Sequence, residues 1–120
     1  MECGGENRRE GDIALSALLS LHNIAMNGGV LHSVEHHSQD EIAAGVAGYR
    51  YFNLASAADV FEWVTRQTVQ IDLASNLDAA EVLEAEADRR YAEVVPDDAI
   101  LLDRFRNRFG TTPGAFAPLR

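Results

Sequence analysis

Apolar side chains recur at every third or fourth position through most of this sequence, and this spacing constrains the fold more than any other feature. In the segment 55–73, for example, Ala57, Val60, Phe61 and Val64 fall on one side of a helix that turns about 100° per residue. No segment alternates apolar and polar residues as a half-buried strand does. The sequence therefore predicts an all-α fold, a compact single-domain bundle of five or six short helices.

Start and stop signals divide this pattern into segments. Asn27-Gly28-Gly29, Pro96 and Gly110 are residues at which helices commonly end. Ser38 and Glu41 have the spacing of a capping box, which predicts a helix that begins directly after Ser38. The expected helices span residues 12–26, 30–37, 39–49, 55–73 and 78–95, and a sixth runs from Asp97 or Asp98 to Phe109.

Two glycines, Gly45 and Gly48, lie inside the third of these helices. A glycine in a helix interior costs about 1 kcal/mol relative to alanine. Close approach of another helix would compensate for this cost, and we expect such a contact here.

The 120 residues suit one domain. We expect a flexible N-terminal lead over residues 1–10, a helical domain over 11–110 and an extended C-terminal tail over 111–120. The only cysteine, Cys3, cannot form an intramolecular disulfide, which fits a reducing compartment. The apolar run 13–21 follows acidic rather than basic residues, so it does not resemble a signal peptide. These features predict a cytoplasmic protein.

The charge balance limits the classes of partner. Nineteen acidic residues stand against ten arginines and no lysine, which gives a net charge of −9. This charge disfavours direct binding to nucleic acid or to an anionic membrane, because both would repel the protein. A basic protein is a compatible partner. Solubility alone is the alternative explanation of the acidity.

The acidic residues are densest around the fifth expected helix, where the stretch from Asp78 to Asp98 holds eight acids against two arginines. Glu81, Glu84 and Asp88 fall in one row along it, with axial steps of about 4.5–6 Å, the same order as the phosphate spacing of nucleic acid. Such a row could offer a DNA-binding protein a substitute for the phosphate backbone, and its alternative is a solvated helix face. The candidate partner-binding residues are Asp59, Glu62, Asp78, Glu81, Glu84, Glu86, Asp88 and Glu93.

Trp63 lies away from the apolar side of the fourth expected helix. Its indole is therefore either half-buried against a neighbouring helix or part of a partner-binding surface. The second reading gives an alternative function, in which an immunity or regulatory protein binds its partner through an apolar patch around Trp63.

The stretch MNGGVLHSVEHH, residues 26–37, raises the question of a metal site. His32 and His36 share one face of a helix, as in metal-binding HExxH motifs, and a metal-dependent hydrolase is the outside alternative. However, Glu35 is not at the position of the catalytic base in that motif. Asp40, His22 or His37 would have to supply a third ligand. We expect a turn in a helical scaffold, with no cofactor, no metal and no catalytic residue.

Three segments, residues 21–38, 43–64 and 87–109, together with Ala117-Pro118-Leu119, resemble the DNA mimic protein 19 family over about residues 13–119. The resemblance implies an all-helical fold that is commonly dimeric. For the founding member it also implies a DNA mimic, which occupies the DNA-binding surface of a helix-turn-helix transcription factor and relieves repression. Asn27, Gly28 and Gly29 match the family signature as helix-junction residues.

Overall fold

The computed structural model describes residues 10–71 and 75–111, and all secondary structure elements in this part of the chain are helices. The helices are α1 (Glu10–Gly28), α2 (Val30–His36), α3 (Gln39–Tyr51), α4 (Ala55–Gln70), α5 (Leu77–Val94) and α6 (Asp98–Thr111). The predicted all-α single-domain bundle is confirmed. Among the described helices, none is long and apolar enough to cross a membrane. Most of the expected lead and tail lies outside the described residues.

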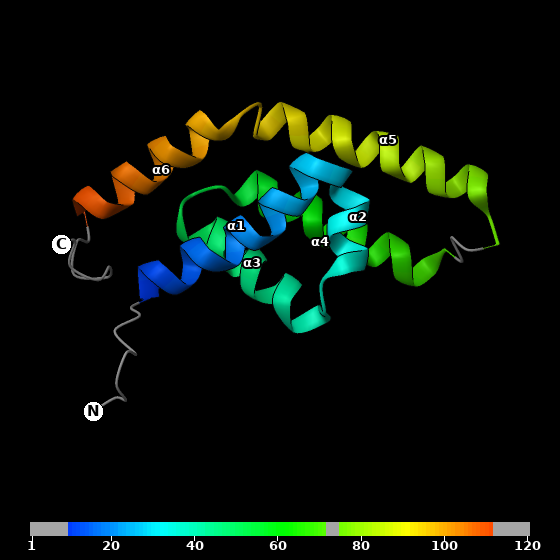
Figure 1. Cartoon of the computed structure of the whole chain (residues 1–120), viewed down its shortest axis with the longest axis horizontal. Helices are drawn as coiled ribbons and strands as arrows, with labels where there is room; N and C mark the ends of the chain where they lie inside the picture. The colour runs from blue at the N-terminus through cyan, green and yellow to red at the C-terminus, as the bar shows by residue number, and fades with distance from the viewer. Residues whose placement is uncertain (1–9, 72–74, 112–120) are drawn as a thin grey trace.

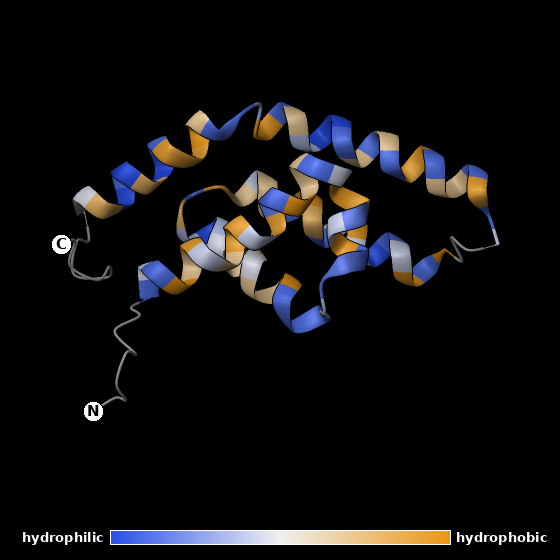
Figure 2. Cartoon of the chain, in the orientation of Figure 1, coloured by the Kyte–Doolittle hydropathy of each residue, from blue (hydrophilic) through white to orange (hydrophobic). Residues whose placement is uncertain are grey.

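Figure 1 shows α5 and α6 as an arch along one side of the molecule, with α1 to α4 gathered beneath it. The most extensive helix pair is α1 with α3, and α5 packs against α2 and α4. Apolar and polar bands alternate along α5 and α6 in Figure 2, as expected of amphipathic helices. The apolar side of α5 buries Leu83, Ala87 and Tyr91, so its other sides remain free to carry charge.

The two glycines of α3 lie where α1 approaches most closely, as expected. A Cβ atom on Gly45 would lie 2.2 Å from Leu21 Cδ1, and one on Gly48 would lie 2.4 Å from the carbonyl oxygen of Ala14. Any side chain at these positions would therefore push the two helices apart. The contact explains why α3 contains two residues that disfavour helices.

The junction between α1 and α2 is formed by one glycine rather than three residues. Asn27 and Gly28 still belong to α1, which extends two residues beyond the expected Met26. Gly29 alone adopts a positive φ of 97°, a conformation that residues with a side chain rarely adopt. The capping box at the start of α3 is confirmed, because Glu41 N donates to Ser38 Oγ over 3.1 Å and Ser38 N donates to Glu41 Oε1 over 2.8 Å.

Most of the other predicted helix boundaries also differ from the structure, by one to three residues. Helix α4 ends at Gln70, and residue 73, its expected end, lies outside the described residues. Helix α5 begins at Leu77 because the Asn76 side chain accepts a hydrogen bond from Ala79 N over 3.0 Å. Gly110 does not close the last helix, which continues to Thr111. A glycine ends a helix only where the backbone turns left-handed, and here it does not.

Candidate functional site

One side of α5 carries three carboxylates that have no partner. Asp78, Glu81 and Glu84 are exposed, and within the described residues none of them forms a hydrogen bond or an ion pair. They follow one another at intervals of three residues along the helix. We call Asp78, Glu81 and Glu84 the α5 acidic face.

Glu86 and Glu93 lie on a different side of the same helix. At about 100° per residue, they point roughly 160° away from Glu81, Glu84 and Asp88. The eight candidate acids therefore do not form one continuous surface. The row of Glu81, Glu84 and Asp88 that the sequence predicts does lie on one flank.

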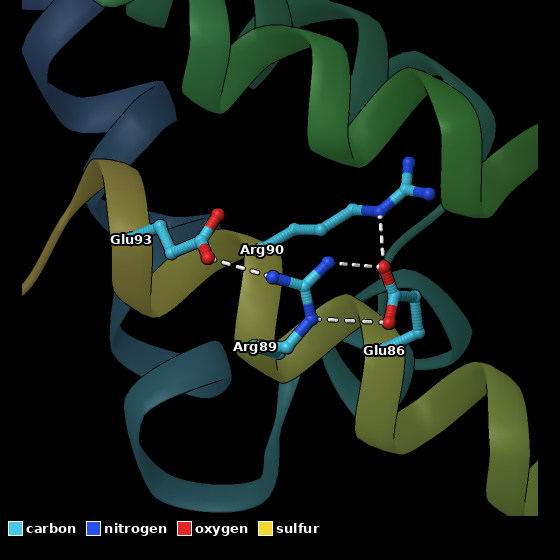
Figure 3. A network of polar contacts seen from close by, with 4 residues as sticks. All are labelled: Glu86, Arg89, Arg90 and Glu93. Carbon is cyan, nitrogen blue, oxygen red and sulfur yellow. Dashed lines mark hydrogen bonds and ion pairs between the residues drawn. The ribbon is translucent and has the colours of Figure 1, made fainter.

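Arginines of α5 form ion pairs with Glu86 and Glu93 (Figure 3). Arg89 Nη2 lies 2.6 Å from Glu86 Oε2, and Arg89 Nη1 lies 2.6 Å from Glu93 Oε2. Arg90 Nε donates to the same Glu86 oxygen over 2.8 Å. The hydrogen bond from Arg89, followed by that from Arg90, lowers the pKa of Glu86 to about 2. The Glu86 carboxylate therefore stays ionised near neutral pH, and arginines compensate the charge of both glutamates locally.

The two candidate acids of α4 are also paired. Arg50 Nη2 of α3 donates to Asp59 Oδ1 over 3.0 Å and to Glu62 Oε1 over 2.7 Å. The hydrogen bond to Asp59 is the main reason that the pKa of Arg50 is raised. These exposed ion pairs connect α3 to α4 and leave little uncompensated charge on α4 for a partner.

Asp88 caps another helix. Its Oδ1 atom accepts a hydrogen bond from Val30 N over 2.9 Å, at the first residue of α2. A carboxylate at this position satisfies an amide that has no partner within the helix and interacts favourably with the helix dipole. Gly29, the N-terminal neighbour of Val30, provides no side chain for this purpose. Asp88 therefore holds α5 to α2, whatever else it binds.

Trp63 is half-buried against α5, as in the first of its two predicted environments, and contact of its exposed part with a partner stays a prediction. The guanidinium carbon of Arg90 lies 3.9 Å from the centroid of the indole ring. Trp63 also lines a groove of about 410 Å³ between α4 and α5, together with Gln67, Ile71 and Val82. We call this hollow the α4–α5 groove.

The histidines of the α2 region do not form a metal site in the described part of the chain. The exposed rings of His32 and His36 have centroids 6.2 Å apart, and no group of three metal-ligating side chains occurs among the described residues. His37 is half-buried: its Nδ1 donates to the Ser33 carbonyl over 2.8 Å, and Ser20 Oγ lies 3.0 Å from its Nε2. This imidazole fixes the end of α2 to α1, which supports the expected structural role of the stretch.

Sequence reasoning missed a buried polar chain that joins four helices. His22 Nε2 lies 2.7 Å from Asp98 Oδ1, His22 Nδ1 lies 2.7 Å from the Tyr91 hydroxyl, and that hydroxyl lies 2.6 Å from the hydroxyl of Tyr49. An ionised carboxylate only accepts hydrogen bonds, so Nε2 carries a proton, and in the tautomer with that single proton Nδ1 accepts from the Tyr91 hydroxyl. Burial raises the pKa of both tyrosines well above the ordinary range.

A signal for this chain exists in the sequence. His22 occupies a core position of α1 beside Leu18, Leu21 and Ala25, and Tyr91 occupies a core position of α5. Polar side chains at core positions need partners. The interpretation of His22 as a third metal ligand overlooks this core position.

Comparison with known protein families, with curated proteins and with solved structures gave no match.

Proposed function

We propose that this protein is a non-enzymatic binding domain that presents the α5 acidic face to a basic protein, and that this partner is a DNA-binding transcriptional regulator. The observation that carries the proposal is the set of exposed, uncompensated carboxylates at Asp78, Glu81 and Glu84. The other candidate acids differ from these three, because each accepts a hydrogen bond from an arginine or from the backbone amide of Val30.

The spacing of these charges suits a DNA-binding surface. Successive carboxylates are about 4.5 Å apart along the helix axis, compared with about 3.4 Å per phosphate along one DNA strand. Arginine and lysine side chains that bind phosphates could therefore pair with this face. Like charges at such spacing weaken an isolated helix slightly, and α5 is held instead by its buried side, which includes Leu83 and Tyr91.

Exposed charges mainly determine association rate and salt sensitivity. The proposal therefore requires binding that weakens as salt increases. The test is a pull-down from lysate of the source cell at low and high salt, with and without competing duplex DNA. A DNA-binding protein that is captured only at low salt and released by DNA is the expected result.

Two triple variants make this test specific. The variant Asp78→Asn, Glu81→Gln, Glu84→Gln removes the α5 acidic face, and the expected result is loss of capture. The control Glu35→Gln, Asp40→Asn, Asp103→Asn removes three exposed charges elsewhere and should retain capture. Each set includes one aspartate in the first turn of a helix, so both change a helix terminus equally. Retained binding in the first variant contradicts the proposal.

Asp88 is left unchanged in this design. Because its carboxylate caps α2, a substitution there would alter folding as well as surface charge.

A further inference from the structure

The shape of the α4–α5 groove suits the binding of a short helix. Its α4 wall consists of Trp63 and Gln67, and Ile71 follows directly after the end of the helix. From Trp63 to the end of α4 the wall extends about 10 Å. Its α5 wall includes Ala79 and Val82, and the buried Leu83 closes the floor. Two apolar walls of this length match about two turns of a helix that inserts apolar side chains at i, i+3 or i+4, and i+7.

Val82 shows that this groove is open. Its side chain is 70% exposed even though it lies on an apolar wall. A ligand that covers it would remove this apolar surface from water, which favours binding. Val69 is 76% exposed as well, but it does not line the groove. The two valines therefore provide a site residue and a matched control.

The free carboxylate at the groove favours a basic occupant. Asp78 stands at one end with no partner among the described residues, and the net charge of the protein is −9. Glu86 on the α5 wall is already paired with Arg89 and Arg90. Arg90 is held at the Trp63 end by the ring and by Glu86. A helix with apolar residues on one face and arginine or lysine beside them would complement this arrangement.

We infer that the α4–α5 groove binds an amphipathic, basic helix of the partner, with its apolar face against Trp63 and Val82 and a cationic side chain toward Asp78. This inference rests on the proposed function and adds to it the shape of the partner. It distinguishes an apolar anchor flanked by charge from a purely electrostatic contact. Apolar contact at the centre of an interface carries most of the affinity, whereas charges at the rim add rate and specificity.

The probe is a synthetic amphipathic peptide of about four helical turns, with leucines at i, i+3, i+7 and i+10, arginines beside them and no tryptophan. A scrambled peptide of the same composition has the same charge but no apolar face. Trp63 is the only tryptophan of the chain, so its fluorescence reports on the groove directly. The expected result is saturable binding of the amphipathic peptide with a change in Trp63 emission, and binding of the scrambled peptide that is weaker by about tenfold or more.

Two variants of the full chain locate the contact. Val82→Ser should weaken binding of the amphipathic peptide about tenfold, and Val69→Ser should leave it unchanged. Both residues are highly exposed, so neither variant should affect folding. Ala79→Phe, which would fill the groove from the α5 wall, provides an independent check and should also weaken binding.

Several outcomes overturn the inference. They are absence of binding, equal binding of the scrambled peptide, and unchanged affinity in Val82→Ser. If affinity is unchanged in Val82→Ser but lost in the triple variant Asp78→Asn, Glu81→Gln, Glu84→Gln, the groove is not the binding site and the proposed function stands. If Val82→Ser weakens binding and the acidic triple variant does not, the occupant is not selected by charge and the basic character of the helix is refuted, whereas the pull-down alone decides the proposed function.

Discussion

His22 Nε2 lies 2.7 Å from Asp98 Oδ1, and this contact joins a side chain that is 2% exposed to one that is 84% exposed. The imidazole belongs to α1 and the carboxylate to the first residue of α6. Through Tyr91 the same ring reaches α5. One histidine therefore fixes both helices of the arch to the body of the molecule.

The two ends of this contact should contribute differently to stability. His22→Ala removes a buried ring and should lower the free energy of unfolding by about 2–4 kcal/mol. Asp98→Ala should lower it by only about 1–2 kcal/mol, because water can replace an exposed carboxylate. Urea unfolding measures both values, and Asp103→Ala, an exposed acid of the same helix, serves as the control. An equal loss in the two variants would contradict the described geometry.

The buried tyrosines predict a loss of stability at alkaline pH. A tyrosine in the unfolded chain loses its proton near pH 10, whereas burial keeps Tyr49 and Tyr91 protonated in the native state above that pH. Since the native state then binds more protons, the free energy of unfolding should fall as pH rises above about 10, by up to about 1.4 kcal/mol per pH unit for each hydroxyl. Urea unfolding between about pH 9 and pH 11 tests this. Tyr49→Phe should reduce the slope, and an unchanged slope would refute the prediction.

Adjacent glycines should respond in opposite ways to alanine. Gly29→Ala should destabilise the protein by about 1–2 kcal/mol, because φ is positive there and the new Cβ would lie 3.2 Å from both carboxylate oxygens of Asp88. Gly28→Ala should be neutral or slightly stabilising, since Gly28 is helical and the new atom would meet only the exposed, flexible side chain of His32. Thermal unfolding of the two variants tests the pair, and the reverse order would show that the junction is not formed by Gly29.

The contact between α1 and α3 predicts a further pair of effects. Gly48→Ala should cost about 2–3 kcal/mol or more, because the backbone oxygen of Ala14 that the new Cβ would meet cannot rotate away. Gly110→Ala should stabilise α6 by about 0.5–1 kcal/mol, because it is helical and has no neighbour within 4 Å. Chemical unfolding distinguishes them, and a neutral Gly48→Ala would mean that the helices are further apart than described.

Features that depend on neighbouring residues were predictable from the sequence. The six helices, the capping box of Ser38 and Glu41, and the close approach at Gly45 and Gly48 follow from patterns within about four positions. The contacts of Arg89 also follow this spacing, since Glu86 and Glu93 lie three and four residues away. Helix ends were less accurate, because a cap such as Asn76 competes with other polar residues nearby.

Contacts between distant parts of the chain were not predictable. Asp88 and Val30 are 58 residues apart, and only the packing of α5 on α2 turns one member of the acidic row into a helix cap. The same holds for His22, whose partners are 69 and 76 residues away. Counting charges along the sequence therefore overstates the acidic surface, because pairing by Arg50 or capping by Asp88 depends on tertiary structure.

The close contact between α1 and α3 also has a consequence for the order of folding. Only the seven residues of α2 and two short connections separate these helices along the chain, so they can meet after closing a small loop. Contacts of this kind form early, whereas the polar chain from His22 to Asp98 requires most of the sequence to be in place. We expect the α1–α3 pair to belong to the folding nucleus, so that Gly48→Ala slows refolding, while His22→Ala mainly accelerates unfolding.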